Sequence, residues 1–342
     1  MKTINENFIK KSLLLAIFTI GFSSLVAQML LLRELLVVFA GNELSIGVIL
    51  ANWLILGGLG SLIMGKWAEK IKHRIEIFVS IVVLLFISLS AAIYLARILK
   101  NLLDVAIGEG LGFSIILYSS FFILLPIGIF NGALFTLGCR ISSDFFGSNA
   151  VSIGKVYIYG TIGTIVGGIS WTYLLVPFFN AFQISIGLTL LNLLACLVLM
   201  FFARKRSVLN GVIIAFYAVS IMFCAYLLFT DGANGLHLQS IEKQWAPLNV
   251  VHYQNSIYGN IVVTETEEQY TFFLDGIEHI TLPIPNIIAI EEFVHTSMLS
   301  HPYPRNLLVL GGGAGGVINE ILKHPSVETI DYTELDPLLI EL

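Results

Sequence analysis

Charged residues are scarce in this chain. Asp, Glu, Lys and Arg together make up only 12% of its 342 residues, whereas hydrophobic residues make up 56%. A soluble domain is about a quarter charged, so the composition excludes an ordinary soluble protein and indicates an integral membrane protein whose partner is the lipid bilayer. The sequence also has no basic face interleaved with aromatic residues, which argues against a nucleic-acid partner.

Cysteine is scarce as well. The three cysteines, Cys139, Cys196 and Cys224, all lie in or beside apolar segments. An odd number of cysteines without paired spacing provides neither a disulfide framework nor a metal site. We therefore interpret them as small buried hydrophobic residues, and we expect no bound metal.

Long apolar stretches fill the first two thirds of the chain. A membrane-spanning helix needs roughly 20 mostly apolar residues, and about seven stretches meet this length: 12–32, 44–65, 75–96, 113–138, 156–178, 182–203 and 208–229. The first stretch lacks the small residue of a signal-peptidase site, because Leu25 precedes Val26 and Ala27, so we expect it to be retained. Residues 1–230 are thus predicted to form a transmembrane helical domain.

Basic residues are distributed unevenly between the predicted loops. Loops on the side of the N-terminus contain Lys2, Lys10, Lys11, Lys66, Lys70, Lys72, Arg74, Arg140, Lys155, Arg204, Lys205 and Arg206, and the opposite loops contain only Arg33, Arg97 and Lys100. This bias predicts a multi-pass protein of the cell membrane with a cytoplasmic N-terminus. Seven spans would place the rest of the chain outside, where a cytosolic cofactor is not supplied. Either one stretch does not span, or the C-terminal part faces outward.

Small and ionisable residues interrupt the apolar stretches. Glycines spaced for close helix contact occur in three places: Gly57, Gly60 and Gly65, Gly128 and Gly132, and Gly163 and Gly167. Arg33 and Glu34 are candidates for a functional role because they are ionisable, but they fit the interfacial end of the first helix equally well. Residues 65–74 resemble the short basic loop after the second helix of major-facilitator transporters, which keeps a transporter as one alternative.

The last third of the chain has a different pattern. Residues 249–280 alternate apolar and polar side chains around a turn at "TEEQ", which predicts a small antiparallel sheet within residues 231–284. Ile287, Ile290, Val294, Met298 and Leu299 recur at helical spacing, so a helix is predicted over about 285–300, ending before proline.

A glycine-rich loop follows the apolar residues 307–310, which are typical of a buried parallel strand. The loop contains Gly311, Gly312, Gly313 and Gly316 and fits G-x-G-x-x-G. A helix is predicted over 315–324 and a second strand over 328–335. That strand ends at Glu334, about 20 residues after the loop, where an acid binds ribose hydroxyls in dinucleotide-binding proteins. The pattern predicts a site for an adenosyl-type ligand; the alternative is a purely structural strand–helix–strand unit.

The stretches "SIYGNIVVTE", "FLDG", "FVHTSMLSHP", "LVLGGGAGG", "EILKHPSVETI" and "TELDP" resemble, in order and spacing, the spermidine synthase (polyamine aminopropyltransferase) family. The first two thirds resemble the multi-helix membrane region fused to such domains in some bacterial proteins. The resemblance implies a multi-pass α-helical membrane domain over 1–230, a small β-domain over 231–284, and the start of a Rossmann-like α/β methyltransferase fold over 285–342. It also implies transfer of an aminopropyl group from decarboxylated S-adenosylmethionine to putrescine.

The resemblance extends to individual residues. It implies that Glu334 holds the ribose and that the glycine loop lies beside the nucleoside. His295 matches a family histidine, and Asp275 matches the aspartate of "LDG". With Tyr258 and Asp336 in the matching motifs, the predicted cofactor-binding residues are Gly311, Gly312, Gly313, Gly316, Glu334, Asp336, His295, Tyr258 and Asp275.

This sequence also departs from the family pattern. Gly259 and His279 stand where the family has glutamines, Thr296 replaces an acidic residue, and Ala314 replaces the aspartate of "GGGDGG". The lost aspartate would make a charge-assisted contact to the donor worth about 1.5–3 kcal/mol. S-adenosylmethionine, which keeps its carboxylate, is therefore an alternative ligand.

The family's catalytic aspartates lie in a loop that would follow residue 342. We therefore assign no catalytic residue, and we expect this chain, as a C-terminally truncated form, not to be a competent enzyme by itself. Three functions stay open: a membrane-bound aminopropyltransferase-like protein, an S-adenosylmethionine-binding methyltransferase-like protein, and a transporter or scaffold with a regulatory nucleoside-binding domain. The acceptor, a polyamine by resemblance, and the oligomeric state stay open too.

Overall fold

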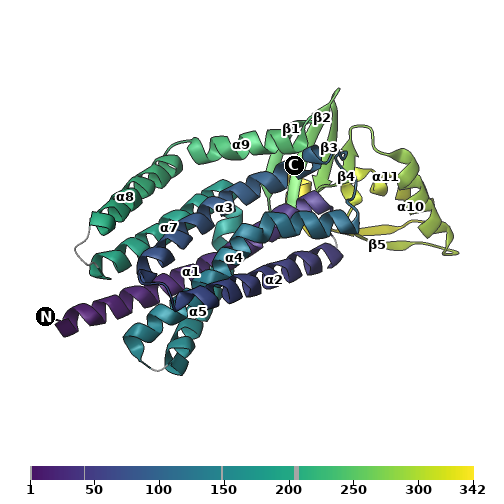
Figure 1. Ribbon diagram of the computed structural model, residues 1–342. Helices are drawn as coiled ribbons and strands as arrows, with labels where there is room; N and C mark the ends of the chain where they lie inside the picture. The colour runs from purple at the N-terminus through teal and green to yellow at the C-terminus, as the bar shows by residue number, and fades with distance from the viewer. Residues whose placement is uncertain (1, 42, 148, 204–207) are drawn as a thin grey trace.

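The computed structural model describes residues 2–41, 43–147, 149–203 and 208–342. A bundle of long helices forms one part of the molecule, and a small sheet followed by a short α/β unit forms the other (Figure 1). The N-terminus lies at the end of the bundle that is farthest from the sheet. This arrangement places the predicted nucleoside-binding residues beyond the opposite end of the bundle.

The predicted apolar stretches all form helices. In the described residues, seven helices are long and apolar enough to cross a membrane. Most continue beyond the apolar stretch at one or both ends. They are α1 (Lys2–Phe39), α2 (Glu43–Ala68), α3 (Arg74–Leu102), α4 (Phe113–Phe146), α5 (Asn149–Ser170) with the π-helical turn Trp171–Leu175 and α6 (Val176–Phe178), α7 (Ala181–Ala203) and α8 (Val208–Phe229).

Glycines allow two helix pairs to approach closely. A Cβ atom on Gly132 of α4 would overlap the carbonyl of Gly57 on α2, and one on Gly163 of α5 would overlap the carbonyl of Phe18 on α1. The prediction that these glycines serve helix packing is therefore confirmed. Gly65 differs from this prediction, since a Cβ atom there would meet nothing within 4 Å.

The positions of several basic residues differ from the loop assignment made from sequence. Arg97 and Lys100 lie inside α3, and Arg33 lies inside α1. Arg97 can stay within a helix because a carboxylate inside the protein neutralises it. Arg204, Lys205 and Arg206 lie outside the described residues, as does the side chain of Lys2.

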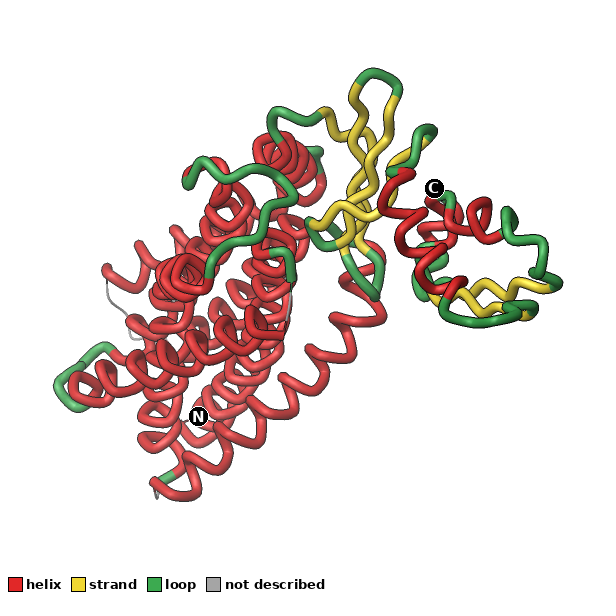
Figure 2. The backbone as a smooth tube through the Cα atoms, turned by 90° about the vertical axis from the view of Figure 1, so that its right-hand side faces the viewer, coloured by secondary structure: helices red, strands yellow, loops and turns green. Residues whose placement is uncertain are grey.

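A short amphipathic helix and a four-stranded sheet follow the bundle (Figure 2). The helix α9 was not predicted from the sequence. The sheet is antiparallel in the order β1-β2-β3-β4, as predicted, and the turn at "TEEQ" joins its second and third strands. The elements are α9 (Gly232–Trp245), β1 (Asn249–Asn255), β2 (Asn260–Thr266), β3 (Gln269–Leu274) and β4 (Ile277–Leu282).

The sheet is covered on both faces. Val262 and Phe273 pack against Val37 of α1 and Trp245 of α9. The alternate residues of the strands, including Ile261, Val263 and Phe272, form a separate cluster with Leu339. The sheet therefore lies between the helical bundle and the C-terminal unit.

The C-terminal unit is a parallel strand pair with helices packed against it. Strands β5 and β6 pair in parallel, and a core of Val294, Met298, Val309, Val317 and Ile321 joins α10 to α11 and β5. The helix predicted over 315–324 is shorter in the structure, because Gly316 adopts a left-handed conformation directly before it. The elements are α10 (Ile287–Leu299), β5 (Asn306–Leu310), the 3-10 turn Gly313–Gly315, α11 (Val317–Ile321), β6 (Thr329–Thr333) and α12 (Leu338–Glu341).

Candidate functional site

The glycine loop joins the end of β5 to the start of α11. Gly311, Gly312 and Gly316 have φ angles of 73°, 71° and 102°, which side chains with a Cβ atom rarely adopt. At Gly313 a Cβ atom would lie 2.6 Å from the ring of Tyr332. On Gly311 or Gly312 a Cβ atom would meet nothing within 4 Å. The backbone conformation of the loop thus requires glycine at these positions. At Gly311 and Gly312 the backbone faces open space that a ligand can enter.

Glu334 lies beside this loop, directly after β6. The parallel pairing continues past β5, since the Gly311 N–H donates to the carbonyl of Thr333 at 2.8 Å. The carboxylate of Glu334 accepts hydrogen bonds from the Tyr332 hydroxyl at 2.6 Å and from the Leu335 N–H at 2.9 Å. The structure therefore brings Glu334 and the glycine loop together, as the spacing of the motif predicts.

The charge of Glu334 is maintained by its surroundings. Partial burial alone would raise the pKa of its carboxyl, but the Tyr332 hydroxyl and the main-chain N–H groups of Leu335, Gly312 and Asp336 outweigh that effect and lower the pKa. An ionised carboxylate acts only as a hydrogen-bond acceptor, which is the role that ribose hydroxyls need from a partner.

Asp336 is buried near the same loop and accepts a hydrogen bond from a residue two positions further along the chain. Its Oδ1 accepts a hydrogen bond from the Leu338 N–H at 3.2 Å, at the start of α12. Asp336 also interacts electrostatically with Arg33 of α1. Its role toward a ligand stays a prediction.

Asp275 and Tyr258 lie at turns of the sheet. Oδ1 of Asp275 accepts a hydrogen bond from the Asn260 N–H at 2.8 Å. Burial raises the pKa of this carboxyl, against the opposing effects of that hydrogen bond and of Arg33. Tyr258 is 50% exposed. A Cβ atom on Gly259 would lie 2.9 Å from Oδ2 of Asp275, so the glutamine of the family would not fit here unless Asp275 moved.

Arg33 connects the membrane helices to this part of the sheet. Its Nη2 donates to the carbonyl of Ser256, at 2.6 Å, and to the carbonyl of Gly259. The sequence marks Arg33 as an ionisable residue near a helix end, and the structure shows that it joins α1 to the β1–β2 turn. Its proximity to Asp275 and Asp336 was not foreseen, because no short motif relates these residues.

His295 contacts side chains of α11 and of the turn that follows it. Its Nδ1 lies 2.8 Å from Nε2 of His324, and its Nε2 lies 3.6 Å from a carboxylate oxygen of Glu320. Glu320 is on α11, and His324 is in the turn that follows it. The nucleoside contact implied for His295 stays a prediction, and the grouping with Glu320 and His324 was missed at the level of sequence. The sequence shows only that Glu291 and His295, and likewise Glu320 and His324, are four residues apart; it does not show that the two pairs face one another.

A buried ion pair supports the junction between the bundle and the sheet. Arg97 of α3 binds Glu34 of α1 and donates to the Ser240 hydroxyl of α9 at 2.6 Å. The same guanidinium lies 3.1 Å from Nδ1 of His237. Burial and the nearby Arg97 lower the pKa of His237 to about 3. His237 is therefore neutral near pH 7, with Nδ1 free to accept from Arg97.

Comparison with known proteins supports the family resemblance of the C-terminal part of the chain. Residues 287–342 match the spermine/spermidine synthase domain. Residues 287–342 are called the synthase segment below. The glycine loop, Glu334 and the His295 cluster all lie inside this synthase segment.

Several polyamine aminopropyltransferases are similar to the chain. The protein of Methanocaldococcus jannaschii is 55% identical over 119 residues, which is 35% of this chain and 39% of that protein. The protein of Oceanobacillus iheyensis is 26% identical over 227 residues (64% and 42%), and that of Mycobacterium tuberculosis is 29% identical over 187 residues (53% and 34%). The chain thus spans less than half the length of each. The alignment of 227 residues is longer than everything after α8, so it extends into the apolar helices.

Proposed function

We propose that this chain is a membrane-embedded, nucleoside-binding protein of the aminopropyltransferase type. Its ligand would be decarboxylated S-adenosylmethionine, with the ribose held by Glu334 and the adenosyl group beside Gly311–Gly316. The observation that supports this most directly is the ionised Glu334 carboxylate at the end of β6, next to a glycine loop whose backbone faces open space.

In the reaction of this class, a polyamine nitrogen attacks the carbon next to the sulfonium sulfur. A C–N bond forms, the C–S bond breaks, methylthioadenosine leaves, and the amine loses a proton. Carboxylates near the reacting centre stabilise the cationic donor and the cationic amine. Asp336 is a buried carboxyl group close to Glu334, and Asp275 is a half-buried carboxyl group at the β3–β4 turn. We propose both for this electrostatic role.

S-adenosylmethionine is the second candidate ligand, and two observations favour it. Ala314 lies in the glycine loop where the resemblance implies an aspartate, so one negative charge is missing. Arg33 adds a positive charge beside Gly259 and Asp275. The missing negative charge and the additional positive charge both favour S-adenosylmethionine, which keeps its carboxylate, over decarboxylated S-adenosylmethionine.

A cavity in the bundle supports the transporter alternative. It has a volume of about 370 Å³ and lies among α1, α2, α4 and α5. Ser61, Asn131 and Thr164 contribute polar groups to a wall that is otherwise mainly apolar and glycine-rich. Solute flux in vesicles that contain the purified chain would support this function.

Ligand binding tests the proposal. The full chain in lipid nanodiscs is titrated with decarboxylated S-adenosylmethionine, S-adenosylmethionine and methylthioadenosine. Glu334→Gln is expected to weaken binding of methylthioadenosine by about tenfold to hundredfold, because hydrogen bonds to a charged group are lost. Glu328→Gln, at an exposed glutamate in the same segment, is the matched control. Equal affinities for the two variants would contradict the assignment of the ribose site.

A further inference from the structure

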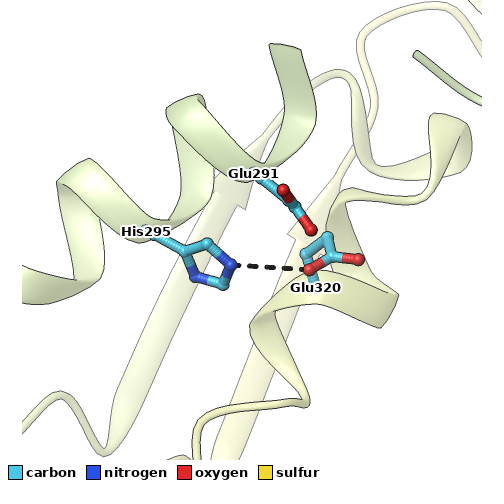
Figure 3. A group of neighbouring side chains, drawn as sticks. All are labelled: Glu291, His295 and Glu320. Atoms are coloured by element: carbon cyan, nitrogen blue, oxygen red, sulfur yellow. Dashed lines mark ion pairs between the residues drawn. The ribbon is translucent and has the colours of Figure 1, made fainter. Parts of the chain in front are cut away.

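Two facing pairs of residues meet between α10 and α11. Glu291 and His295 are one turn apart on α10, and Glu320 and His324 are four residues apart on α11 and the turn that follows it. Figure 3 shows the side chains of Glu291 and His295 directed toward Glu320. One ligand atom from each of these three residues lies within 4.8 Å of the others. Two carboxylates and an imidazole thus converge on one point.

The carboxylate of Glu320 provides a second, independent observation that points to a ligand. The residue is only 8% exposed, and its Oε2 is buried without a hydrogen-bond partner. The other oxygen, Oε1, accepts from Nζ of Lys323. A buried carboxylate oxygen without a partner is unfavourable. Oε2 is the atom that faces His295.

The groups around the cluster are arranged as they are around metal ligands. Nδ1 of His295 lies 2.8 Å from Nε2 of His324. When His295 carries its proton on Nδ1 and donates it to His324, the Nε2 lone pair is directed at the cluster. A second hydrogen bond of this kind orients metal-binding histidines in proteins, and ligating carboxylates are likewise held by hydrogen bonds. Lys323 does this for Glu320.

An ion pair between His295 and Glu320 explains the cluster less well. The two atoms are 3.6 Å apart, which is too long for a hydrogen bond, so Oε2 would stay unsatisfied. It would also leave Glu291 as a second carboxylate next to the first. A divalent cation satisfies all three groups at once.

We propose that Glu291, His295 and Glu320 bind one Zn²⁺ ion. Oxygen and imidazole ligands suit this metal, and three protein ligands leave a fourth position for water. With ligand bonds of about 2.0–2.2 Å, tetrahedral ligand atoms are roughly 3.5 Å apart, so side-chain rotation has to close the cluster slightly. The bound ion joins α10 to α11, the helix that directly follows Gly316 of the glycine loop. The sequence predicts no metal because the ligands come from two separate helices.

Zn²⁺ titration of the whole chain tests this site. Protein purified in detergent without a histidine tag is stripped with a chelator and titrated with Zn²⁺, and the bound metal is quantified. We expect one Zn²⁺ per chain. Glu291→Gln should weaken binding at least tenfold, whereas Glu292→Gln, at the next and exposed position of the same helix, should leave it unchanged. His324→Ala should weaken binding by about tenfold to hundredfold, the usual effect of losing an outer hydrogen bond.

Co²⁺ provides a readout that does not depend on stability. Its visible absorption should show the intense bands of a four- or five-coordinate nitrogen and oxygen site in the parent and in Glu292→Gln, and lose them in His295→Gln. Absence of stoichiometric Zn²⁺ in the parent, or equal Zn²⁺ binding by the Glu291 and Glu292 variants, would overturn the proposal. Neither result bears on nucleoside binding, which is measured separately.

Discussion

The guanidinium of Arg97 and the carboxylate of Glu34 form a two-point ion pair inside the protein. Nε of Arg97 lies 2.7 Å from Oε2 of Glu34, and Nη2 lies 2.8 Å from Oε1. The exposed fractions of the two side chains are 0% and 6%. The pair joins α1 to α3, and Arg97 also contacts Ser240 of α9, so the pair stabilises the end of the bundle that packs against the sheet.

Removing one partner of this pair should destabilise the protein strongly. Glu34→Gln leaves Arg97 as a buried charge without a counterion, which costs about 3–5 kcal/mol. Thermal unfolding in detergent, followed by tryptophan fluorescence, measures the change. The exposed pair of Arg305 and Glu328, with atoms 3.5 Å apart, serves as the control, and Arg305→Met should change stability by less than about 1 kcal/mol. Similar losses of stability in Glu34→Gln and Arg305→Met would show that burial does not determine how much an ion pair contributes to stability.

Acid should weaken the same junction through His237. Its pKa is about 3 in the folded protein against about 6.5 when unfolded, so between these values the unfolded state binds more protons. This contribution to stability is complete above pH 6.5 and falls as the pH decreases toward 3, by up to about 1.4 kcal/mol per pH unit. Unfolding of the parent and of His237→Gln from pH 7 to pH 4 isolates the effect. Parallel curves for the two proteins would contradict it.

Gly313→Ala should disturb the glycine loop. The added Cβ atom would lie 2.6 Å from the ring of Tyr332, and this ring carries the hydroxyl that binds Glu334. We expect nucleoside affinity to fall at least tenfold, as measured by isothermal titration. Gly110→Ala is the control, because a Cβ atom there meets nothing within 4 Å. Unchanged affinity in Gly313→Ala would show that the loop does not hold the ligand.

Ala314→Asp should shift the preference between the two candidate donors. The new carboxylate attracts the cationic chain of decarboxylated S-adenosylmethionine and repels the carboxylate of S-adenosylmethionine. Ala314 is exposed, and solvent screens such charges, so we expect the ratio of the two dissociation constants to change by roughly tenfold. Ala314→Asn controls for size. The same ratio of dissociation constants in Ala314→Asp and Ala314→Asn would show that the side chain at position 314 does not discriminate between the donors by their charge.

Labelling of single cysteines should reveal the sidedness of the synthase segment. Asn234 lies in the first turn of α9, which follows the seventh long helix, and Lys70 lies in the turn between α2 and α3. With seven spans, these two positions are on opposite sides of the membrane. With the N-terminus in the cytoplasm, an impermeant maleimide should label Asn234→Cys in intact cells and Lys70→Cys only after permeabilisation. The reverse result would place the synthase segment in the cytosol and contradict the orientation predicted from loop charges.

The sequence predicts the helices well because their signal is local. Runs of about 20 apolar residues suffice to locate them, but not to find their ends. Helix α1 continues past residue 32 because Arg33 and Glu34 find partners in the sheet and in α3. Helix α9 was missed because "GANGLHLQSIEKQW" has no long apolar run, and packing against α3, α7 and β1 compensates for its weak pattern.

The candidate site, like the helices, could be predicted from the sequence only where the signal is local. The glycine loop and Glu334 belong to one strand–loop–helix–strand unit, so spacing alone brings them together. The Arg33 contact with Gly259 joins residues 226 positions apart, and the cluster of Glu291, His295 and Glu320 depends on how two helices pack. Neither is encoded in a short motif, and both required the three-dimensional structure.

Neighbouring residues of strand β2 point to different partners. Val262 belongs to the cluster that contains Val37 and Trp245, whereas Ile261 and Val263 belong to the cluster that contains Leu339. Neither partner can slide over the sheet without exposing apolar surface on one side. The sheet thus links the bundle on one face to the synthase segment on the other, so the plane of the bilayer helps to set the height at which the glycine loop meets its ligand.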